Sequence, residues 1–215
     1  MRHLTFLITA GPTQEPLDPV RYLSNRSSGK MGYALAAAAR RLGHKVILVS
    51  GPVALDAPRR VKLIRVTTAS EMSREVLRHA SNADVIVMVA AVADFRPAKI
   101  PRFKIKKTGG PLTLRLAPTP DILSALGKRK RKNQILVGFA AETSNTLANA
   151  RKKLRQKNCD WIVLNRIDRK GSVFGSDSNK ATLLSRDGDV TSLPHASKKV
   201  LAANILRSIL RGSGL

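Results

Sequence analysis

The residues best suited to chemistry in this 215-residue chain gather in the stretch SNRSSGKMG, at positions 24–32. Its Ser27-Ser28-Gly29 turn leads into an alanine-rich segment that we expect to be a helix. Free backbone N–H groups, two hydroxyl groups and the positive end of the helix dipole would meet there, beside the charge of Lys30. The stretch therefore predicts a phosphate-binding turn. The alternative is that Ser27 or Ser28 only caps the helix.

The two common phosphate-loop patterns do not describe this turn. A Walker A loop ends in Gly-Lys followed by Ser or Thr, but Gly29-Lys30 is followed by Met31, which has no hydroxyl group for magnesium. A dinucleotide-binding fingerprint has three spaced glycines directly after the first strand. Gly11 follows that strand, but Thr13 stands where the second glycine belongs. The sequence therefore argues against a P-loop kinase and against an ordinary dehydrogenase.

Strand-like and helix-like segments alternate along the chain. Apolar runs typical of buried strands lie at 6–10, 46–50, 61–66, 84–92, 135–140 and 161–165, and helices are expected at 29–42, 70–80, 145–157 and 195–210. This order predicts a single α/β domain over residues 1–215, with a Rossmann-like, mostly parallel sheet and helices on both faces. Because ligands of such sheets bind beyond the carboxyl ends of the strands, we expect the site there.

Two stretches break this alternation. Residues 98–118 are basic, contain Gly109-Gly110 and end in LTLRLAP, which predicts a flexible arm and a strand outside the main sheet. Residues 180–194 carry the turn signal Asp187-Gly188 and predict a hairpin. We expect both to be insertions or appendages of the domain, with strand edges that favour dimer contact.

The charge of the chain favours anionic ligands. Lys and Arg number 39 against 14 Asp and Glu, which gives a net charge of +25 and attracts nucleic acid, anionic membrane or phosphate ligands. Aromatic residues are only 4%, and no nucleic-acid-binding motif is present, so a specific nucleic-acid reader is disfavoured. No apolar run is long enough to span a bilayer. The single cysteine, Cys159, excludes an internal disulfide and suits a cytoplasmic location.

Seven sequence blocks, in order, resemble one family. ITAGPTQEPLDPVRYLSNRSSGKMGYALA is followed by AAVADFRP, KIKK, TPDIL, GFAAET, ARKKLRQKNCDWIVLN and FGSDSN. Together these blocks are similar to the bacterial phosphopantothenoylcysteine synthetase domain, and the resemblance covers essentially the whole chain. That domain is often fused behind a flavin-dependent decarboxylase, of which this chain shows no segment, so we expect a stand-alone synthetase.

The resemblance implies a ligase that joins 4′-phosphopantothenate to L-cysteine in coenzyme A biosynthesis. CTP activates the carboxylate as an acyl-cytidylate, and the cysteine amine then displaces CMP. By the same resemblance, Asn25 holds the acyl-cytidylate carbonyl, and Arg21 holds the substrate phosphate or the intermediate. Lys104 closes over the triphosphate from the basic arm. The expected contacts with phosphate come from Ser27, Ser28, Gly29 and Lys30.

The resemblance also implies a CTP site. Asp94 follows the strand expected at 84–92 and would help hold the nucleotide or a metal ion, Mg²⁺ or Mn²⁺. Lys153 and Lys157 share a helix face and match nucleotide-site lysines of the family. Alone, they would be an ordinary basic face. The remaining CTP contacts would come from Met88, Val89, Ala90, Pro120, Asp121, Ile122, Leu123 and Phe139.

Further expectations follow from the family. They are a homodimer with active sites close to the subunit boundary, no flavin in this chain, no membrane contact and a separate phosphopantothenoylcysteine decarboxylase as a candidate partner. Three alternatives stay open: an NAD(P)- or nucleotide-binding Rossmann-like module, a basic nucleic-acid-binding protein, and a ligase of the same family that uses ATP. The glycine fingerprint is missing for the first and a recognition motif for the second. The AAVADFRP and KIKK blocks favour CTP over ATP.

Overall fold

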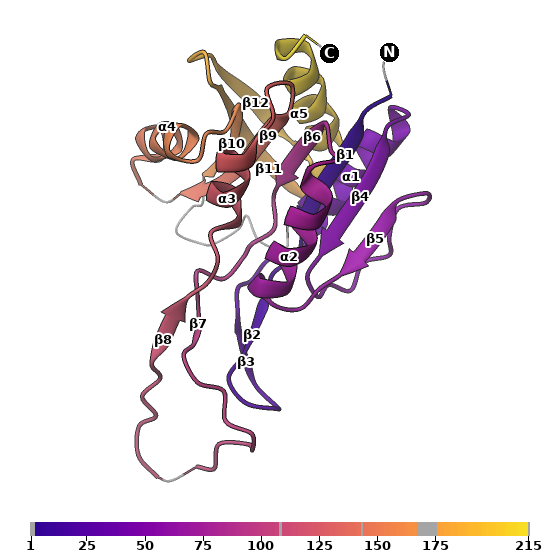
Figure 1. The fold of residues 1–215 in the computed structure, drawn as a ribbon. Helices are drawn as coiled ribbons and strands as arrows, with labels where there is room; N and C mark the ends of the chain where they lie inside the picture. Colours follow the sequence, from indigo (N-terminus) through magenta and orange to yellow (C-terminus); the bar gives the residue numbers. More distant parts are fainter. Residues whose placement is uncertain (1–2, 108, 143, 167–175, 215) are drawn as a thin grey trace.

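An eight-stranded sheet forms the centre of the protein (Figure 1). The computed structural model describes residues 3–107, 109–142, 144–166 and 176–214. The strand order is β12-β11-β10-β9-β6-β1-β4-β5. The parallel strands are β1 (Thr5–Ala10), β4 (Lys45–Ser50), β5 (Lys62–Arg65), β6 (Val85–Met88), β9 (Ile135–Glu142) and β10 (Trp161–Arg166). The antiparallel strands β11 (Ser178–Ser185) and β12 (Val190–Ser197) complete it at one edge.

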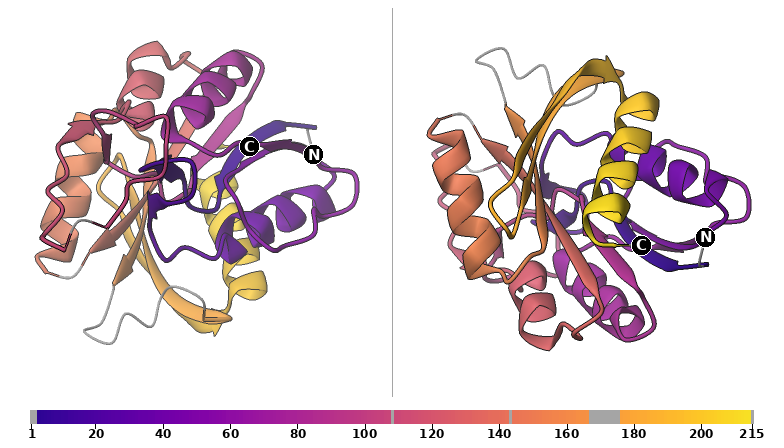
Figure 2. Two further views of the ribbon diagram at one scale, coloured as in Figure 1. Left: turned by 90° about the horizontal axis from the view of Figure 1, so that it is seen from below. Right: turned by 90° about the horizontal axis from the view of Figure 1, so that it is seen from above.

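Helices cover both faces of this sheet (Figure 2). On one face lie α1 (Lys30–Arg41) and α5 (Lys198–Gly212), which pack against each other. On the other face lie α2 (Ala69–Ala80), α3 (Ile122–Arg129) and α4 (Thr146–Gln156). The predicted α/β, mostly parallel, Rossmann-like fold is confirmed. None of the helices in the described ranges is long and apolar enough to cross a membrane.

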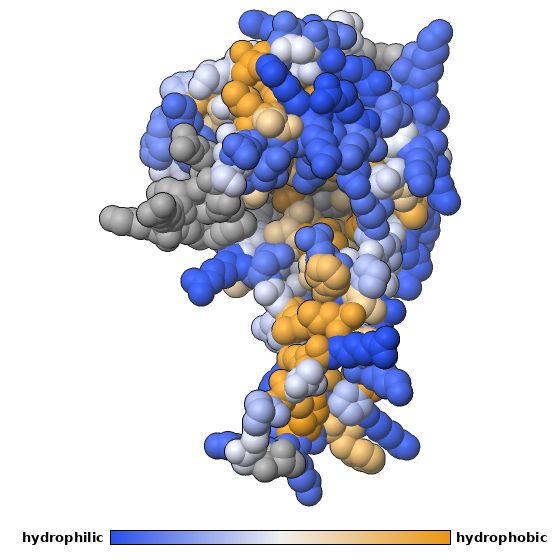
Figure 3. Space-filling view, turned by 90° about the vertical axis from the view of Figure 1, so that its left-hand side faces the viewer, coloured by the Kyte–Doolittle hydropathy of each residue, from blue (hydrophilic) through white to orange (hydrophobic). Residues whose placement is uncertain are grey.

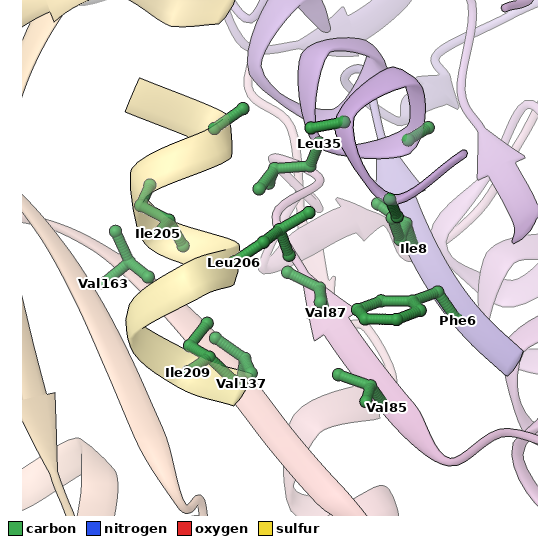
Figure 4. Close-up of a cluster of buried hydrophobic side chains, with 14 of the residues drawn as sticks. Phe6, Ile8, Leu35, Val85, Val87, Val137, Val163, Ile205, Leu206 and Ile209 are labelled. Carbon is green, nitrogen blue, oxygen red and sulfur yellow. The ribbon is translucent and has the colours of Figure 1, made fainter. Parts of the chain in front are cut away.

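The central strands supply apolar side chains to both faces because successive strand residues point to opposite sides. Phe6 and Ile8 of β1 belong to the cluster under α1 and α5, whereas Leu7 between them belongs to the cluster under α2, α3 and α4. Figure 4 shows the first cluster, in which Leu206 of α5 lies over Val87 of β6. Burial on both faces explains why these strands read as continuous apolar runs.

The strand predicted at 84–92 ends earlier than its apolar pattern suggested. β6 stops at Met88. The backbone N–H groups of Val89 and Ala90 both donate to Thr9 Oγ1, each at 3.0 Å, instead of continuing a sheet ladder. The apolar run therefore continues into a loop that Thr9 holds at the end of the sheet.

The hairpin predicted at 180–194 is present, but it is not an appendage. Its strands β11 and β12 join β10 and extend the main sheet, so their inward side chains complete its core. By contrast, the strand expected near 112–118 is short. It is β8 (Leu116–Pro118), which pairs with β7 (Phe95–Pro97) in a separate two-stranded sheet.

The arm hangs below the body of the protein, between β7 and β8 (Figure 1). Beside its base lies a second small hairpin, β2 (Gln14–Pro16) and β3 (Tyr22–Ser24), formed within the long segment between β1 and α1. Sequence patterns predicted neither this hairpin nor helix α3, because both segments are short and lack a clear apolar period.

Candidate active site

A cavity of about 800 Å³ opens at the carboxyl ends of β6, β9 and β10. The N-termini of α1, α3 and α5 border it, so it lies where an open α/β sheet is expected to bind a ligand. All but two of the predicted site residues line its wall: Asn25, Ser27, Ser28, Gly29, Lys30, Met88, Val89, Ala90, Asp94, Pro120, Asp121, Ile122, Leu123, Phe139, Lys153 and Lys157.

The turn before α1 is shaped by two glycines. Gly29 is the N-cap residue and has a left-handed φ of 75°, which glycine adopts without strain. A Cβ atom on Gly32 would lie 2.5 Å from Ala10 Cβ, so this glycine lets the first turn of α1 pack against β1. The start of α1 has no side-chain cap and no acidic residue in its first turn. The alternative that Ser27 or Ser28 caps this helix is therefore wrong, and the positive helix end faces the pocket.

Asn25 is fixed by two hydrogen bonds at the pocket wall. Its Nδ2 donates to the Ala91 carbonyl at 2.6 Å, and its Oδ1 accepts from the Ser27 backbone N–H at 3.2 Å. An amide NH₂ group has two N–H bonds. One of them is used by Ala91, so the other can donate to a ligand oxygen in the pocket.

The loop after β6 is held by threonine hydroxyl groups. Thr9 accepts from the N–H groups of Val89 and Ala90, as described above, and Thr13 Oγ1 accepts from the Ala93 N–H at 2.9 Å. Both threonines are fully buried. No sequence pattern singled them out, although two hydroxyl residues flanking the end of the first strand are a usable signal. They position the backbone of residues 89–93 along the pocket.

At the other end of the pocket, the basic side chains already contact protein groups. Lys153 Nζ donates to the Phe139 carbonyl at 2.8 Å, and burial lowers the pKa of Lys153. Lys157 forms an ion pair with Asp121. Asp121 also caps α3 through the Ser124 N–H at 2.9 Å. Burial acts to raise the pKa of Asp121, but the Lys157 ammonium and the cap outweigh it and leave this pKa below its ordinary value.

Arg21 and Lys104 do not line the pocket wall. The Arg21 guanidinium donates to the buried Asp18 carboxylate at 2.6 and 3.1 Å and to the Ile105 carbonyl at 3.0 Å. Asp18 in turn accepts from the Ile105 N–H at 3.1 Å, and the Arg21 hydrogen bond chiefly holds the pKa of Asp18 well below its usual range. This pair ties the β2–β3 hairpin to the arm. Lys104 lies exposed on the arm beside Ile105.

Asp94 lines the pocket and has an exposed side chain. Among the described residues, no three His, Cys, Asp or Glu side chains gather in a way that could hold a metal ion. A single carboxylate in the same pocket as the Ser27-Ser28-Gly29 turn still fits Mg²⁺, because this ion commonly takes one or two carboxylates and fills its other positions with substrate phosphates and water. The donor set therefore suits a metal that arrives with a nucleotide.

Several pocket residues received no role from the sequence. Lys198, at the start of α5, is the most polar of them and is buried, and Asn165 and Asn179 end or begin strands that meet the pocket. Two of the quoted blocks contain residues outside the described ranges, namely Thr143, Phe174 and Gly175. The remaining unpredicted wall residues are Met31, Gly32, Ala91, Val92, Pro118, Thr119, Ala140 and Ala141.

Comparison with known proteins identifies the family. Residues 1–212 match the family described as the DNA/pantothenate metabolism flavoprotein C-terminal domain. The chain belongs to this family. Among its curated members, the coenzyme A biosynthesis bifunctional protein CoaBC of Bacillus subtilis is 49% identical over 204 residues, which cover 94% of this chain and 50% of that protein. The chain spans about half the length of the curated relatives it matches.

Solved structures agree with the fold. The C-terminal domain of a CoaBC protein superposes with a TM-score of 0.83 at 44% identity, over 97% of this chain and 95% of that one. A Cab2 variant in complex with phosphopantothenate-cysteine gives a TM-score of 0.82 at 19% identity, over 98% of this chain and 86% of that one. The resemblance to the synthetase domain is thus confirmed, and the second structure adds support for the fold.

Proposed function

We propose that the chain catalyses the CTP-dependent joining of 4′-phosphopantothenate to L-cysteine. The products are 4′-phosphopantothenoylcysteine, CMP and pyrophosphate. One observation carries the proposal. The pocket at the strand ends gathers nearly all of the residues that the synthetase resemblance names, in a chain whose relatives are called coenzyme A biosynthesis proteins.

In the first step, a carboxylate oxygen of 4′-phosphopantothenate attacks the α-phosphorus of CTP. The bond from this phosphorus to the bridging oxygen breaks, and pyrophosphate leaves with the electron pair. The uncapped N-terminus of α1, the hydroxyl groups of Ser27 and Ser28 and the Lys30 ammonium would hold the phosphate oxygens. Bound magnesium would neutralise phosphate charge, and Asp94, which lines the pocket, would help to hold it.

In the second step, the amine of cysteine attacks the acyl carbonyl. The carbon–oxygen bond to CMP breaks, CMP leaves with the electron pair, and the amine loses its proton to solvent. Negative charge develops on the carbonyl oxygen in the transition state. The Asn25 amide, which is oriented by its bonds to Ala91 and Ser27, would donate its second N–H to that oxygen.

The cytidine would lie between α3 and α4, at the end of the pocket opposite α5. The backbone of 88–90 is fixed by Thr9 and can offer its polar groups to the edge of a base. Phe139 and Leu123 supply apolar contacts, while Lys153 and the Asp121–Lys157 pair close the wall. This arrangement supports a nucleotide whose base and phosphates are held at opposite ends.

We further propose that two copies of the chain form the working unit. Large apolar side chains stand exposed on the arm and the adjacent hairpin, where Figure 3 shows a continuous apolar strip. They are Val20, Tyr22, Phe95, Ile100, Phe103, Leu112, Leu114 and Leu116. Burial of this strip against a second copy would bring Lys104 of one arm near the pocket of the other chain. A separate phosphopantothenoylcysteine decarboxylase would act on the product.

The test is pyrophosphate release by the purified chain with Mg²⁺ and 4′-phosphopantothenate, using CTP or ATP, with and without cysteine. We expect release with CTP, little with ATP, and CMP formation only when cysteine is added. Turnover with ATP but not CTP would overturn the choice of nucleotide. No release with either nucleotide, from folded protein, would overturn the ligase and leave a nucleotide-binding module.

A further inference from the structure

Thr119 lies between two prolines at the root of the arm. Pro118 ends β8, and Pro120 begins the segment that leads into α3. Because proline has no backbone N–H, the N–H and the hydroxyl group of Thr119 are the only hydrogen-bond donors of residues 118–120. The following proline also favours an extended backbone at Thr119. The sequence thus leaves one residue as the donor of this segment, and that residue lines the pocket.

Both donors of Thr119 bond to the loop that leads from β6 to β7. Thr119 Oγ1 donates to the Ala93 carbonyl at 2.6 Å, and the Thr119 backbone N–H donates to the Asp94 carbonyl at 2.9 Å. The next residue, Phe95, pairs with Pro118 where β7 and β8 lie side by side (Figure 1). The root of the arm therefore holds three successive residues of this loop and strand.

The same loop is held from the body of the protein by Thr13. This buried residue accepts a hydrogen bond from the Ala93 N–H at its Oγ1, at 2.9 Å. Ala93 therefore bonds to the body through its N–H and to the root of the arm through its carbonyl. The backbone directly before Asp94 is fixed from two sides, and Thr119 supplies one of them.

Asp94 is the residue whose position these bonds set. Its exposed side chain lines the pocket, and an aspartate side chain has only two rotatable bonds. Where its carboxylate can reach is therefore decided largely by its backbone. The Thr119 hydroxyl proton is already used by the Ala93 carbonyl, so this group acts through the loop and not as a donor to a ligand.

We propose that Thr119 is a positioning residue that fixes Asp94 for the metal ion that enters with the nucleotide. This inference rests on the proposed function for the identity of the pair, Mg²⁺ with CTP. Loss of the hydroxyl group leaves the Ala93 carbonyl without this donor and loosens the backbone before Asp94. The backbone at 88–90, which is held separately by Thr9, keeps its place. The metal should therefore lose more than the base does.

The test measures CTP binding by calorimetry, with Mg²⁺ and with the metal removed by EDTA. Thr119→Val keeps the shape of the side chain and removes the hydroxyl group. We expect it to weaken CTP binding about fivefold with Mg²⁺, as loss of one hydrogen bond does, and less than about twofold in EDTA. Thr119→Ser should bind as the wild type does. Thr113→Val is the matched control, because Thr113 is exposed on the same arm, and it should change neither value.

A second background separates positioning from a merely structural role. In Asp94→Asn, the further change Thr119→Val should cause no additional loss of CTP binding with Mg²⁺, because the two residues act on one metal. An equal loss with Mg²⁺ and with EDTA would overturn the inference, as would full additivity of the two substitutions. A wild-type chain whose CTP binding gains nothing from Mg²⁺ would overturn it as well.

Pyrophosphate release distinguishes failure of this inference from failure of the ligase. If the wild type releases pyrophosphate from CTP but Thr119→Val binds CTP with Mg²⁺ as tightly as the wild type, the inference fails and the ligase stands. If the wild type binds CTP with Mg²⁺ but releases no pyrophosphate, and Thr119→Val shows the metal-dependent loss, the ligase fails and the positioning role stands.

Discussion

The pocket in the body and the arm below it differ in how much of their side-chain surface the chain itself covers. In the body, the buried Thr9 and Thr13 hydroxyl groups hold the loop that lines the pocket, and apolar side chains pack on both faces of the sheet. On the arm, Phe103 is 76% exposed, and several other large apolar residues are about half exposed. Side chains of the body line the pocket, whereas the arm leaves apolar surface uncovered. Chemistry and assembly should therefore be separable by mutation.

The largest expected effect is at Asn25 in the body. Asn25→Asp replaces the donor amide with a carboxylate, which repels a developing oxyanion, so the amide-forming step should slow by about 10²–10³-fold. The first step should continue, so a burst of pyrophosphate without CMP formation is expected in a rapid-quench assay. The remote, exposed Asn133→Asp serves as the control. Equal loss of both steps would contradict the assigned role.

Substitution of Lys104 tests whether the arm serves the pocket of its own chain or the pocket of a partner chain. Lys104→Gln should slow pyrophosphate release by about 100-fold, and Lys99→Gln, also exposed on the arm, should not. In a mixture of the Asn25→Asp and Lys104→Gln chains, half of the random dimers are mixed and each has one intact site. About a quarter of wild-type activity should therefore return if the arm serves the partner's pocket. No recovery would place Lys104 in the pocket of its own chain.

The exposed apolar strip of the arm should control assembly and not folding. Phe103→Ser together with Leu112→Ser should weaken dimerisation at least about tenfold, measured by sedimentation over a concentration series. The thermal midpoint of the monomer should hardly change, because both side chains are exposed. Leu147→Ser on α4, also exposed, is the control. A wild-type chain that stays monomeric at all concentrations would contradict the proposed dimer.

The smallest effect concerns the Asp18–Arg21 pair that joins the hairpin to the arm. The pKa of Asp18 lies below its ordinary value of 3.8, so its carboxylate stabilises the fold fully above about pH 4. This contribution is lost as the pH falls through the lower, folded-state pKa. In urea titrations below pH 4, wild-type stability should therefore fall more steeply than that of Asp18→Asn. Asp187→Asn, in an exposed turn, should keep the wild-type slope, and equal slopes for all three chains would contradict the assignment.

Local patterns were sufficient to predict most of the fold. The apolar runs around Phe6 and Ile162 predicted central strands because burial on both faces leaves no polar alternation. The helix expected at 29–42 ends close to where it was predicted, and Gly43, with a left-handed φ of 86°, lies just beyond it. The patterns failed at Val89 and Ala90, whose apolar character matched a strand. Their N–H groups instead bond to Thr9, which is 80 residues away in sequence.

The site was predictable where its residues lie in recognisable blocks. Asn25, Lys30 and Asp94 were predicted and line the pocket. Lys198 was missed because a lysine at the start of a C-terminal helix looks like an ordinary surface charge. Only its burial beside Lys30, which is far away in the sequence, distinguishes it. Arg21 was assigned to the ligand, but its guanidinium contacts Asp18 and the arm.

The sequence by itself determined the α/β class, the alternation of strands and helices along the chain and the composition of the turn at 27–30, because each depends on residues near one another in the chain. The tertiary structure decided which of the distant polar residues share a pocket. The order of the strands in the sheet brings α1 and α5 side by side. The ends of β6, β9 and β10 form the floor of the pocket between these two helices and α3. Parallel strands place such segments together only after long crossovers, so no local pattern encodes that proximity.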